Sequence, residues 1–306
     1  MLVKAATGSG AGSEPVAGLL DAAKAGDRRA LSKLLSAVEN GVESRESIGI
    51  PHNSGDGKII GITGAPGVGK SCLVDQLLRT FSATELRIAV LAVDPSSPLT
   101  GGALLGDRLR MQTADDDPNV FVRSLATRNQ PGGLPVRLGL MAEVLVAAGF
   151  DIVLVETVGS GQSEVRIVSV ADRVLLVEGP ARGDEVQAEK AGVLELADAI
   201  VVNKSDLDGA ERVAADLRSA LEIAGNPPPV LLASARNGDG IQELADLLLS
   251  LPTRSDSSMA RWRERLLTAW DAALLSRPDI EEVLSALESG DFDADQWVSD
   301  QLEESN

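Results

Sequence analysis

The sequence predicts an α/β fold in which helices cover both faces of a mostly parallel sheet of about seven strands. From residue 58 onward, short apolar runs alternate with helical stretches, which is the pattern of repeated βαβ units. Hydrophobic residues make up 44% of the chain but aromatic residues only 2%. Aliphatic side chains must therefore fill the core, as is typical of parallel strands that are buried on both faces.

Two segments are expected to precede the sheet. Residues 1–15 are small and polar and predict a disordered leader. Residues 16–57 predict an N-terminal helical extension, because apolar side chains recur at three-to-four spacing over residues 16–40, which is typical of two amphipathic helices. A loop is expected from Gly41 to Gly57, where this periodicity ends.

Residues 58–252 are expected to form the sheet domain, and residues 253–306 a C-terminal helical segment that carries Trp262, Trp270 and Trp297. Each expected strand is a short apolar run bounded by turn-forming or helical sequence. The expected strands are Lys58–Thr63, Arg87–Val93, Val120–Ser124, Asp151–Glu156, Arg173–Val177, Ala199–Val202 and Val230–Ala233.

The charge balance excludes some partners. With 46 acidic and 28 basic residues, the formal net charge is -18, which disfavours binding to nucleic acid and to anionic membranes. No apolar run reaches the roughly 18 residues that a membrane-spanning helix needs. The chain has one cysteine, and Met1–Pro15 lacks the basic start and apolar run of a secretory signal. We therefore expect a cytoplasmic protein.

The strongest local signal is a glycine-rich phosphate-binding loop after the first expected strand. Residues 64–71 match the pattern GxxxxGKS/T, ahead of a helix that starts near Lys70. In such a loop, backbone N–H groups and the helix N-terminus hold phosphates, the lysine reaches the outer phosphates, and the serine ligates Mg²⁺. We expect the small side chain of Cys72 to pack against the sheet. This P-loop NTPase pattern assigns nucleotide binding to Gly64, Ala65, Pro66, Gly67, Val68, Gly69, Lys70, Ser71 and Cys72.

A second motif, Asn203–Asp206, follows the apolar run Ala199–Val202 and matches NKxD. The carboxylate of Asp206 can accept hydrogen bonds from N1–H and the exocyclic amine of guanine, whereas adenine presents the opposite pattern. A loop after the next expected strand supplies a second base contact. The sequence therefore predicts GTP and GDP as ligands, with the base held by Asn203, Lys204, Asp206, Ser234, Ala235 and Arg236.

A third motif, Glu156–Gly159, lies at a strand end in the position of DxxG. Its carboxylate can hold Mg²⁺, and the glycine amide can contact the γ-phosphate only while that phosphate is present. The loop that begins at Asp94 is dense in Asp, Gly and Arg, so that Arg108 or Arg110 could reach the phosphates. The expected ligands of Mg²⁺ are Ser71, Asp94, Asp107 and Glu156.

One expected residue is absent from the third motif. In many GTPases a glutamine follows the DxxG glycine and positions the attacking water. Here Ser160 follows Gly159, and the next glutamine is Gln162. We therefore expect slow intrinsic GTP hydrolysis that a partner stimulates by ordering the loops.

With these motifs, the chain resembles the methylmalonyl-CoA mutase-associated GTPases of the MeaB/ArgK family. The resemblance covers roughly residues 16–250. Besides the three motifs, it rests on the stretches Ala25–Leu31, Val38–Gly41, Asp94–Ser97, Thr100–Gly102, Gly106–Asp107, Gly161–Glu164 and Gly183–Gln187 with Lys190.

The resemblance implies a GTPase chaperone that gates adenosylcobalamin loading and protects or reactivates a B12-dependent acyl-CoA mutase. It also implies that Lys70, Arg110 and Glu156 are the catalytic residues, with Arg110 as the catalytic arginine. Residues Asp184–Lys190 would form a third switch that reports the presence of the mutase. A homodimer formed through a C-terminal arm is implied as well.

Three other functions compete with this interpretation. A metal-insertion GTPase of the nickel type would need a His-rich stretch or a CxxC motif, but the chain has one histidine and one cysteine. A small-molecule P-loop kinase would not need the guanine selection that NKxD predicts. A non-hydrolysing scaffold remains the third alternative, although intact Lys70 and Ser71 argue against it.

Overall fold

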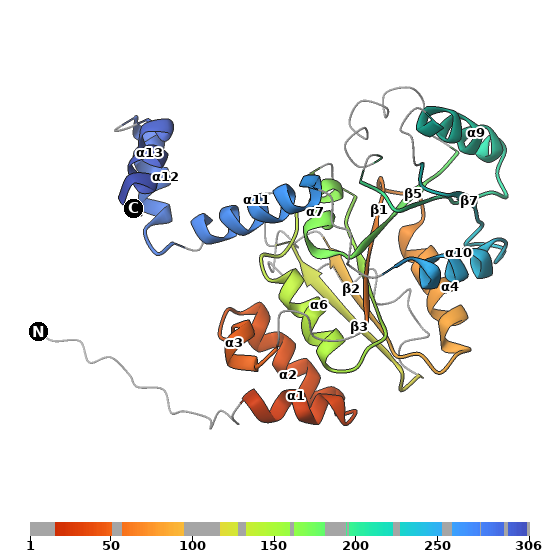
Figure 1. Ribbon diagram of the computed structural model, residues 1–306, viewed down its shortest axis with the longest axis horizontal. Coiled ribbons are helices and arrows are strands. Elements are labelled where there is room, and N and C mark those ends of the chain that lie inside the picture. The colour runs from red at the N-terminus through yellow and green to blue at the C-terminus, as the bar shows by residue number, and fades with distance from the viewer. Residues whose placement is uncertain are drawn as a thin grey trace, which may run out of the picture.

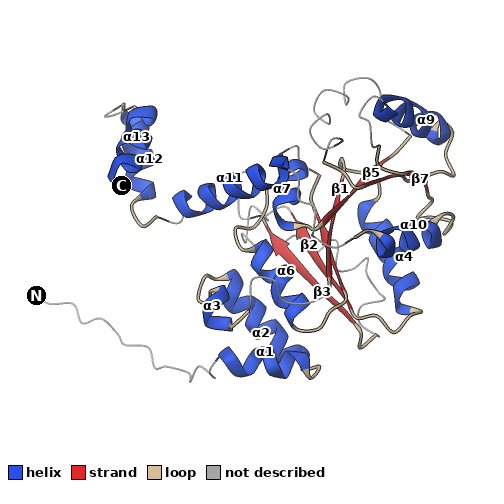
Figure 2. Ribbon diagram, in the orientation of Figure 1, coloured by secondary structure: helices blue, strands red, loops and turns tan. Residues whose placement is uncertain are grey.

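The computed structural model describes residues 16–50, 57–94, 117–127, 133–159, 162–180, 194, 196–222, 227–252, 259–275, 277–290 and 293–304. Its centre is a seven-stranded sheet in the order β3-β2-β4-β1-β5-β6-β7, and each described strand pair is parallel. The strands are β1 (Lys58–Thr63), β2 (Ile88–Asp94), β3 (Val120–Ala126), β4 (Ile152–Glu156), β5 (Arg173–Glu178), β6 (Ala199–Val202) and β7 (Val230–Leu232). The predicted α/β fold is confirmed (Figure 2).

Helices cover the two faces of the sheet, because alternate strand residues point to opposite sides. On one face, Ile60 and Ile62 of β1 pack with α4 (Lys70–Ser82) and α10 (Ile241–Ser250). The other face, which includes Ile59, packs against α6 and α7, while α9 packs on β6 and β7. The bounds of these three helices are Leu138–Ala147 for α6, Gln162–Val170 for α7 and Ala210–Leu221 for α9.

The strand register brings the ends of three central strands to one edge of the sheet. Glu156, the last residue of β4, is paired with Ile62 of β1 on one side and with Ala92 of β2 on the other. The carboxyl ends of β1, β2 and β4 therefore lie side by side. This edge is where ligands bind in open parallel α/β sheets.

The N-terminal extension contains the two predicted helices, α1 (Val16–Lys24) and α2 (Arg28–Glu39). They lie against α6, below the sheet in Figure 1. The carboxylate of Asp27 caps α2 by accepting hydrogen bonds from the backbone N–H groups of Arg29 and Ala30.

The predicted loop from Gly41 to Gly57 is wrong in one place, because it contains a short helix, α3 (Arg45–Ile48). Ser44 and Ser47 form a reciprocal capping box at its start, and Gly49 ends it with a φ of 75°. Four residues span about one helical turn, which is too short for periodicity to be visible in the sequence.

The described residues after 252 contain α11 (Met259–Leu275), α12 (Ile280–Ser289) and α13 (Ala294–Glu304). Helix α11 packs along α7, while α12 and α13 stand away from the sheet (Figure 1). Within the described residues, no helix is both long and apolar enough to cross a bilayer.

Candidate functional site

The phosphate loop connects β1 to α4, and its shape requires glycine at its two ends. Gly64 has a φ of +141°, and a Cβ atom there would lie 2.1 Å from the carbonyl oxygen of Val177. Gly69, with a φ of +95°, caps α4, and a Cβ atom there would lie 2.5 Å from Nδ2 of Asn203. The backbone therefore takes a path that residues with a side chain cannot follow.

The side chain of Lys70 lies inside this loop. Its Nζ donates hydrogen bonds to the carbonyl oxygens of Gly64 at 2.6 Å and Ala65 at 3.1 Å, and the residue is only 6% exposed. An ammonium group in this position, next to the N-terminus of α4, favours the binding of anionic phosphate oxygens.

The rest of the loop is anchored in the core, where Ala65 and Val68 are buried. Gly67 has a φ of +77° and open space around its Cα, and it follows Pro66 at the tip of the loop. The prediction that the side chain of Cys72 packs against the sheet is wrong, because this side chain is exposed. In the helical repeat, Leu73 and Val74 take the inward positions of this turn.

Three oxygen-bearing side chains, those of Ser71, Glu156 and Asp94, lie at the edge of the sheet where β2 and β4 end. Oγ of Ser71 donates a hydrogen bond to Oε1 of Glu156 at 2.7 Å. Asp94 lies two residues beyond Ala92, the register partner of Glu156, and both carboxylates are buried, at 4% and 3% exposure. One hydroxyl and two buried carboxylates form a ligand set that suits Mg²⁺, because burial of carboxylates is costly unless a cation or hydrogen bonds compensate.

Gly159 lies directly against the phosphate loop. With a φ of +84°, it has no room for a Cβ atom, which would lie 2.5 Å from the carbonyl oxygen of Gly64 and 2.6 Å from Nζ of Lys70. The peptide after β4 therefore lies against the phosphate loop and the Lys70 ammonium group. A residue with a side chain at this position would push the two segments apart.

A pair of buried threonines, which sequence reasoning missed, joins the same two segments. Oγ1 of Thr157 donates to Oγ1 of Thr63 at 3.1 Å, and the backbone N–H of Thr157 donates to the carbonyl oxygen of Ile62 at 3.0 Å. Each threonine adjoins a motif residue in sequence, Thr63 before Gly64 and Thr157 after Glu156. Only the strand register reveals that they meet.

The Asn203 side chain connects the guanine motif to the phosphate loop. Its Nδ2 donates to the carbonyl oxygens of Val68 at 2.9 Å and Gly69 at 3.4 Å, and its Oδ1 accepts from the backbone N–H of Ala235 at 3.0 Å. The residue is 1% exposed. Three loops after β1, β6 and β7 are therefore tied together by one amide.

The carboxylate of Asp206 is held by the loop after β7. Its Oδ1 accepts a hydrogen bond from Oγ of Ser234 at 2.6 Å, and Arg236 lies 4.0 Å from Oδ2. The hydrogen bond from Ser234 is the main cause that lowers the pKa of Asp206 below its usual value, so the group is ionised at neutral pH. Lys204 has a φ of 62° and donates from Nζ to the carbonyl oxygen of Gly67 at 2.7 Å.

Several predicted site residues lie outside the described part of the chain. These are Asp107, Arg108, Arg110 and the segment 183–190. The remaining predicted residues converge on the carboxyl-terminal edge of the sheet.

The fold and this arrangement of loops define the class of the protein, a P-loop GTPase. A family model described as methylmalonyl-CoA mutase-associated GTPase MeaB matches residues 31–277. The chain belongs to this family.

Relatives agree with the family assignment. A protein of Pyrococcus horikoshii named as a GTPase is 46% identical over 241 residues, which are 76% of each chain. The fused isobutyryl-CoA mutase of Cupriavidus metallidurans is 43% identical over 198 residues, covering 63% of this chain and 18% of that protein. Among solved structures, a LAO/AO transport system kinase matches with a TM-score of 0.61 and 23% identity, covering 96% of this chain and 99% of that one. That structural likeness supports the fold, and the sequence relatives establish that the protein is a GTPase that binds guanine nucleotides.

Proposed function

We propose that this GTPase is a chaperone that gates adenosylcobalamin loading and protects or reactivates a B12-dependent acyl-CoA mutase of the methylmalonyl-CoA mutase type. Membership of a family described as mutase-associated supports this proposal. The similarity to a stretch of a fused isobutyryl-CoA mutase supports a partner of the same chemical class.

The contact of Gly159 with Gly64 and Lys70 carries the proposal that the protein is a switch. In the GTP state, the amide of Gly159 would bind the γ-phosphate, and the loop after it would move when that phosphate leaves. A partner that contacts this loop would therefore distinguish GTP from GDP. Because no glutamine follows Gly159 to position the attacking water, such a partner would accelerate hydrolysis by supplying that order.

Mg²⁺ is the metal that this site would use. We assign it to Ser71, Glu156 and Asp94, with Asp107 as a further ligand, and it would neutralise charge on the β- and γ-phosphates when bound. Lys70 would stabilise the transferred phosphoryl group, and Arg110 would complete that stabilisation as a catalytic arginine. Asn203, Lys204 and Asp206 would hold guanine together with the loop after β7.

We further propose a homodimer formed through the C-terminal segment. Helix α11 exposes an apolar stripe at helical spacing, with exposures of 84% for Met259, 54% for Trp262, 68% for Leu266 and 53% for Trp270. Exposed aromatic residues in a contiguous patch are typical of protein interfaces.

One cysteine in 306 residues is compatible with a reducing compartment, and we propose a cytoplasmic location.

Single-turnover GTP hydrolysis, measured with and without purified acyl-CoA mutases, tests the proposed function. We expect at least about tenfold stimulation by one enzyme of the methylmalonyl-, isobutyryl-, 2-hydroxyisobutyryl- or ethylmalonyl-CoA mutase class, since partner-supplied ordering is worth far more in other GTPases. An unchanged rate with all four would contradict the proposal.

A further inference from the structure

Helix α7 lies between the sheet and the C-terminal segment. On its inner side, Ile167 is fully buried against β1, where a Cβ atom added at Gly61 would lie 2.4 Å from Cγ1 of Ile167. On its outer side, α7 packs against α11 (Figure 1). A shift of α11 relative to β1 would therefore also move α7, because packed interiors leave little free space.

The start of α7 is close in sequence to Gly159, the residue proposed to contact the γ-phosphate. Helix α7 begins at Gln162, three residues after Gly159, whose backbone lies against Gly64 and Lys70. So short a connection spans at most about 10 Å when it is extended. The position of α7 consequently limits where the Gly159 peptide can lie relative to the phosphate loop.

An ion pair fixes the outer side of α7 to α11. Nη2 of Arg166 donates a hydrogen bond to Oδ2 of Asp271 at 2.5 Å, and the two side chains are only 22% and 36% exposed. Arg166 directly precedes Ile167, so adjacent residues of α7 bind the C-terminal segment and the strand that leads into the phosphate loop.

We propose that Arg166 and Asp271 are positioning residues for GTP recognition, through which the C-terminal segment holds α7 and the Gly159 peptide in place for the γ-phosphate. This inference rests on the proposed role of Gly159. It gives the C-terminal segment an influence on the nucleotide site. GDP lacks the γ-phosphate, and its binding should not depend on the pair.

Charge reversal in the full-length protein tests the proposal. We expect Arg166→Asp and Asp271→Arg each to lower the ratio of GTP affinity to GDP affinity about three- to tenfold, as loss of a partly buried ion pair would. The double variant, which restores the pair in reverse, should recover the ratio. Asp271→Asn, a milder change, supplies the same measurement if a charge reversal prevents folding.

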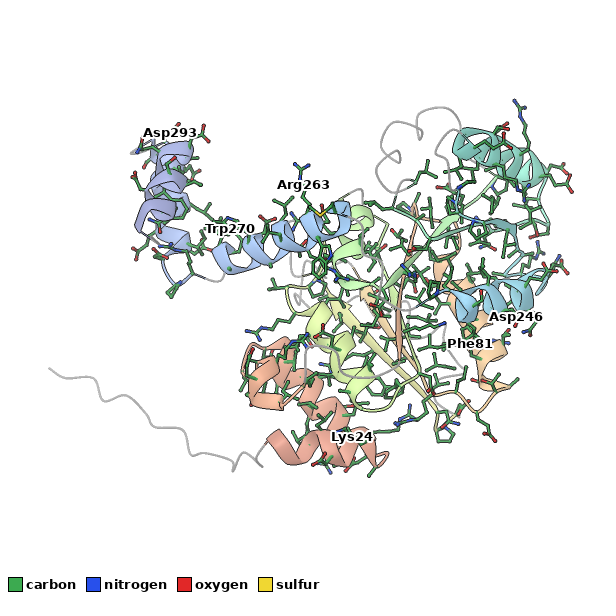
Figure 3. All side chains as sticks on the ribbon, viewed as in Figure 1. Lys24, Phe81, Asp246, Arg263, Trp270 and Asp293 are labelled. Atoms are coloured by element: carbon green, nitrogen blue, oxygen red, sulfur yellow. The ribbon has the colours of Figure 1, made fainter. Side chains whose placement is uncertain are left out.

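Arg263→Asp is the matched control, because Arg263 is on α11 but points away from α7 (Figure 3). It should leave the affinity ratio unchanged. An unchanged ratio in the folded single variants, or a double variant that fails to recover it, would overturn the proposal. These measurements use nucleotide alone, so they remain decisive even if no mutase stimulates hydrolysis.

Discussion

Ser71, at the start of α4, and Glu156, at the end of β4, are joined by a hydrogen bond of 2.7 Å between Oγ and Oε1. The two residues are 85 positions apart in the chain and belong to different motifs. The parallel register of β1 with β4 brings them to the same edge of the sheet. This contact places a hydroxyl and a carboxylate where the phosphates and their metal ion would meet.

Removing either group should weaken Mg²⁺-dependent hydrolysis. We expect Ser71→Ala and Glu156→Gln each to lower the single-turnover rate about 100-fold at fixed Mg²⁺, a typical effect of losing one group that stabilises the transition state. Ser250→Ala, at the exposed end of α10, is the control and should hydrolyse GTP normally. Normal hydrolysis by Glu156→Gln would rule out its role as a metal ligand.

Gly159→Ala should weaken GTP binding more than GDP binding. The added Cβ atom would meet Gly64 and Lys70, so we expect at least about tenfold lower GTP affinity, in addition to about 1 kcal/mol of backbone strain. Gly238→Ala shares the backbone strain, with a φ of +87°, but has open space at its Cα. Calorimetry should therefore find normal GTP affinity in the control, and equal affinities in the two variants would refute the proposed contact.

Asn203→Ala should destabilise the protein as well as weaken nucleotide binding. The change leaves the backbone N–H of Ala235 without its side-chain acceptor and removes the tie to Val68. Because Asn203 is buried, we expect a loss of about 1–3 kcal/mol in the free energy of unfolding, measured by urea denaturation. The exposed Asn237 is the control. A stability loss of similar size in Asn237→Ala would contradict the conclusion that the hydrogen bonds of Asn203 stabilise the protein.

Cys72 is the chain's single cysteine, so the exposure of its thiol can be tested by titration with a thiol reagent. We expect one equivalent of a thiol reagent to react with the native protein, because Cys72 is accessible. Bound nucleotide should slow that reaction, since the residue adjoins the phosphate loop. Reaction only after denaturation would instead indicate the buried position that the sequence predicted.

Most of the sheet was predictable from sequence. Buried parallel strands are near-continuous aliphatic runs, and the seven predicted strands match the observed ones to within two residues at each end. The P-loop and NKxD motifs were predictable too, because each is a local pattern next to a strand. The division into leader, extension, sheet domain and C-terminal segment stays a prediction.

The remaining features depend on packing that a linear sequence does not encode visibly. The short helix α3 depends on a capping box of two serines, and the exposure of Cys72 depends on which side of α4 faces the sheet. Thr63 and Thr157 meet only because β1 and β4 are neighbours. The same holds for the pair of Arg166 and Asp271, which joins helices distant in sequence.

The pKa of Asp206 adds an expectation for pH. A carboxylate whose pKa in the folded protein is below its ordinary 3.8 contributes stability above that value and loses it as the pH falls through the lowered pKa. Asp206 therefore stays ionised from about pH 5 to pH 8, and the preference for guanine should be constant over that range.

The central claim is that the Asp206 carboxylate, together with the phosphate loop, selects guanine nucleotides. The preference for GTP over ATP tests this claim most directly. Calorimetric titrations should give at least about 100-fold tighter binding of GTP than of ATP, because adenine lacks the N1–H and the exocyclic 2-amino donors that guanine would present to the Asp206 carboxylate. Asp206→Asn should lose most of this preference, whereas Asp208→Asn, an exposed neighbour, should retain it. Equal affinity of the unaltered protein for GTP and ATP would contradict the account.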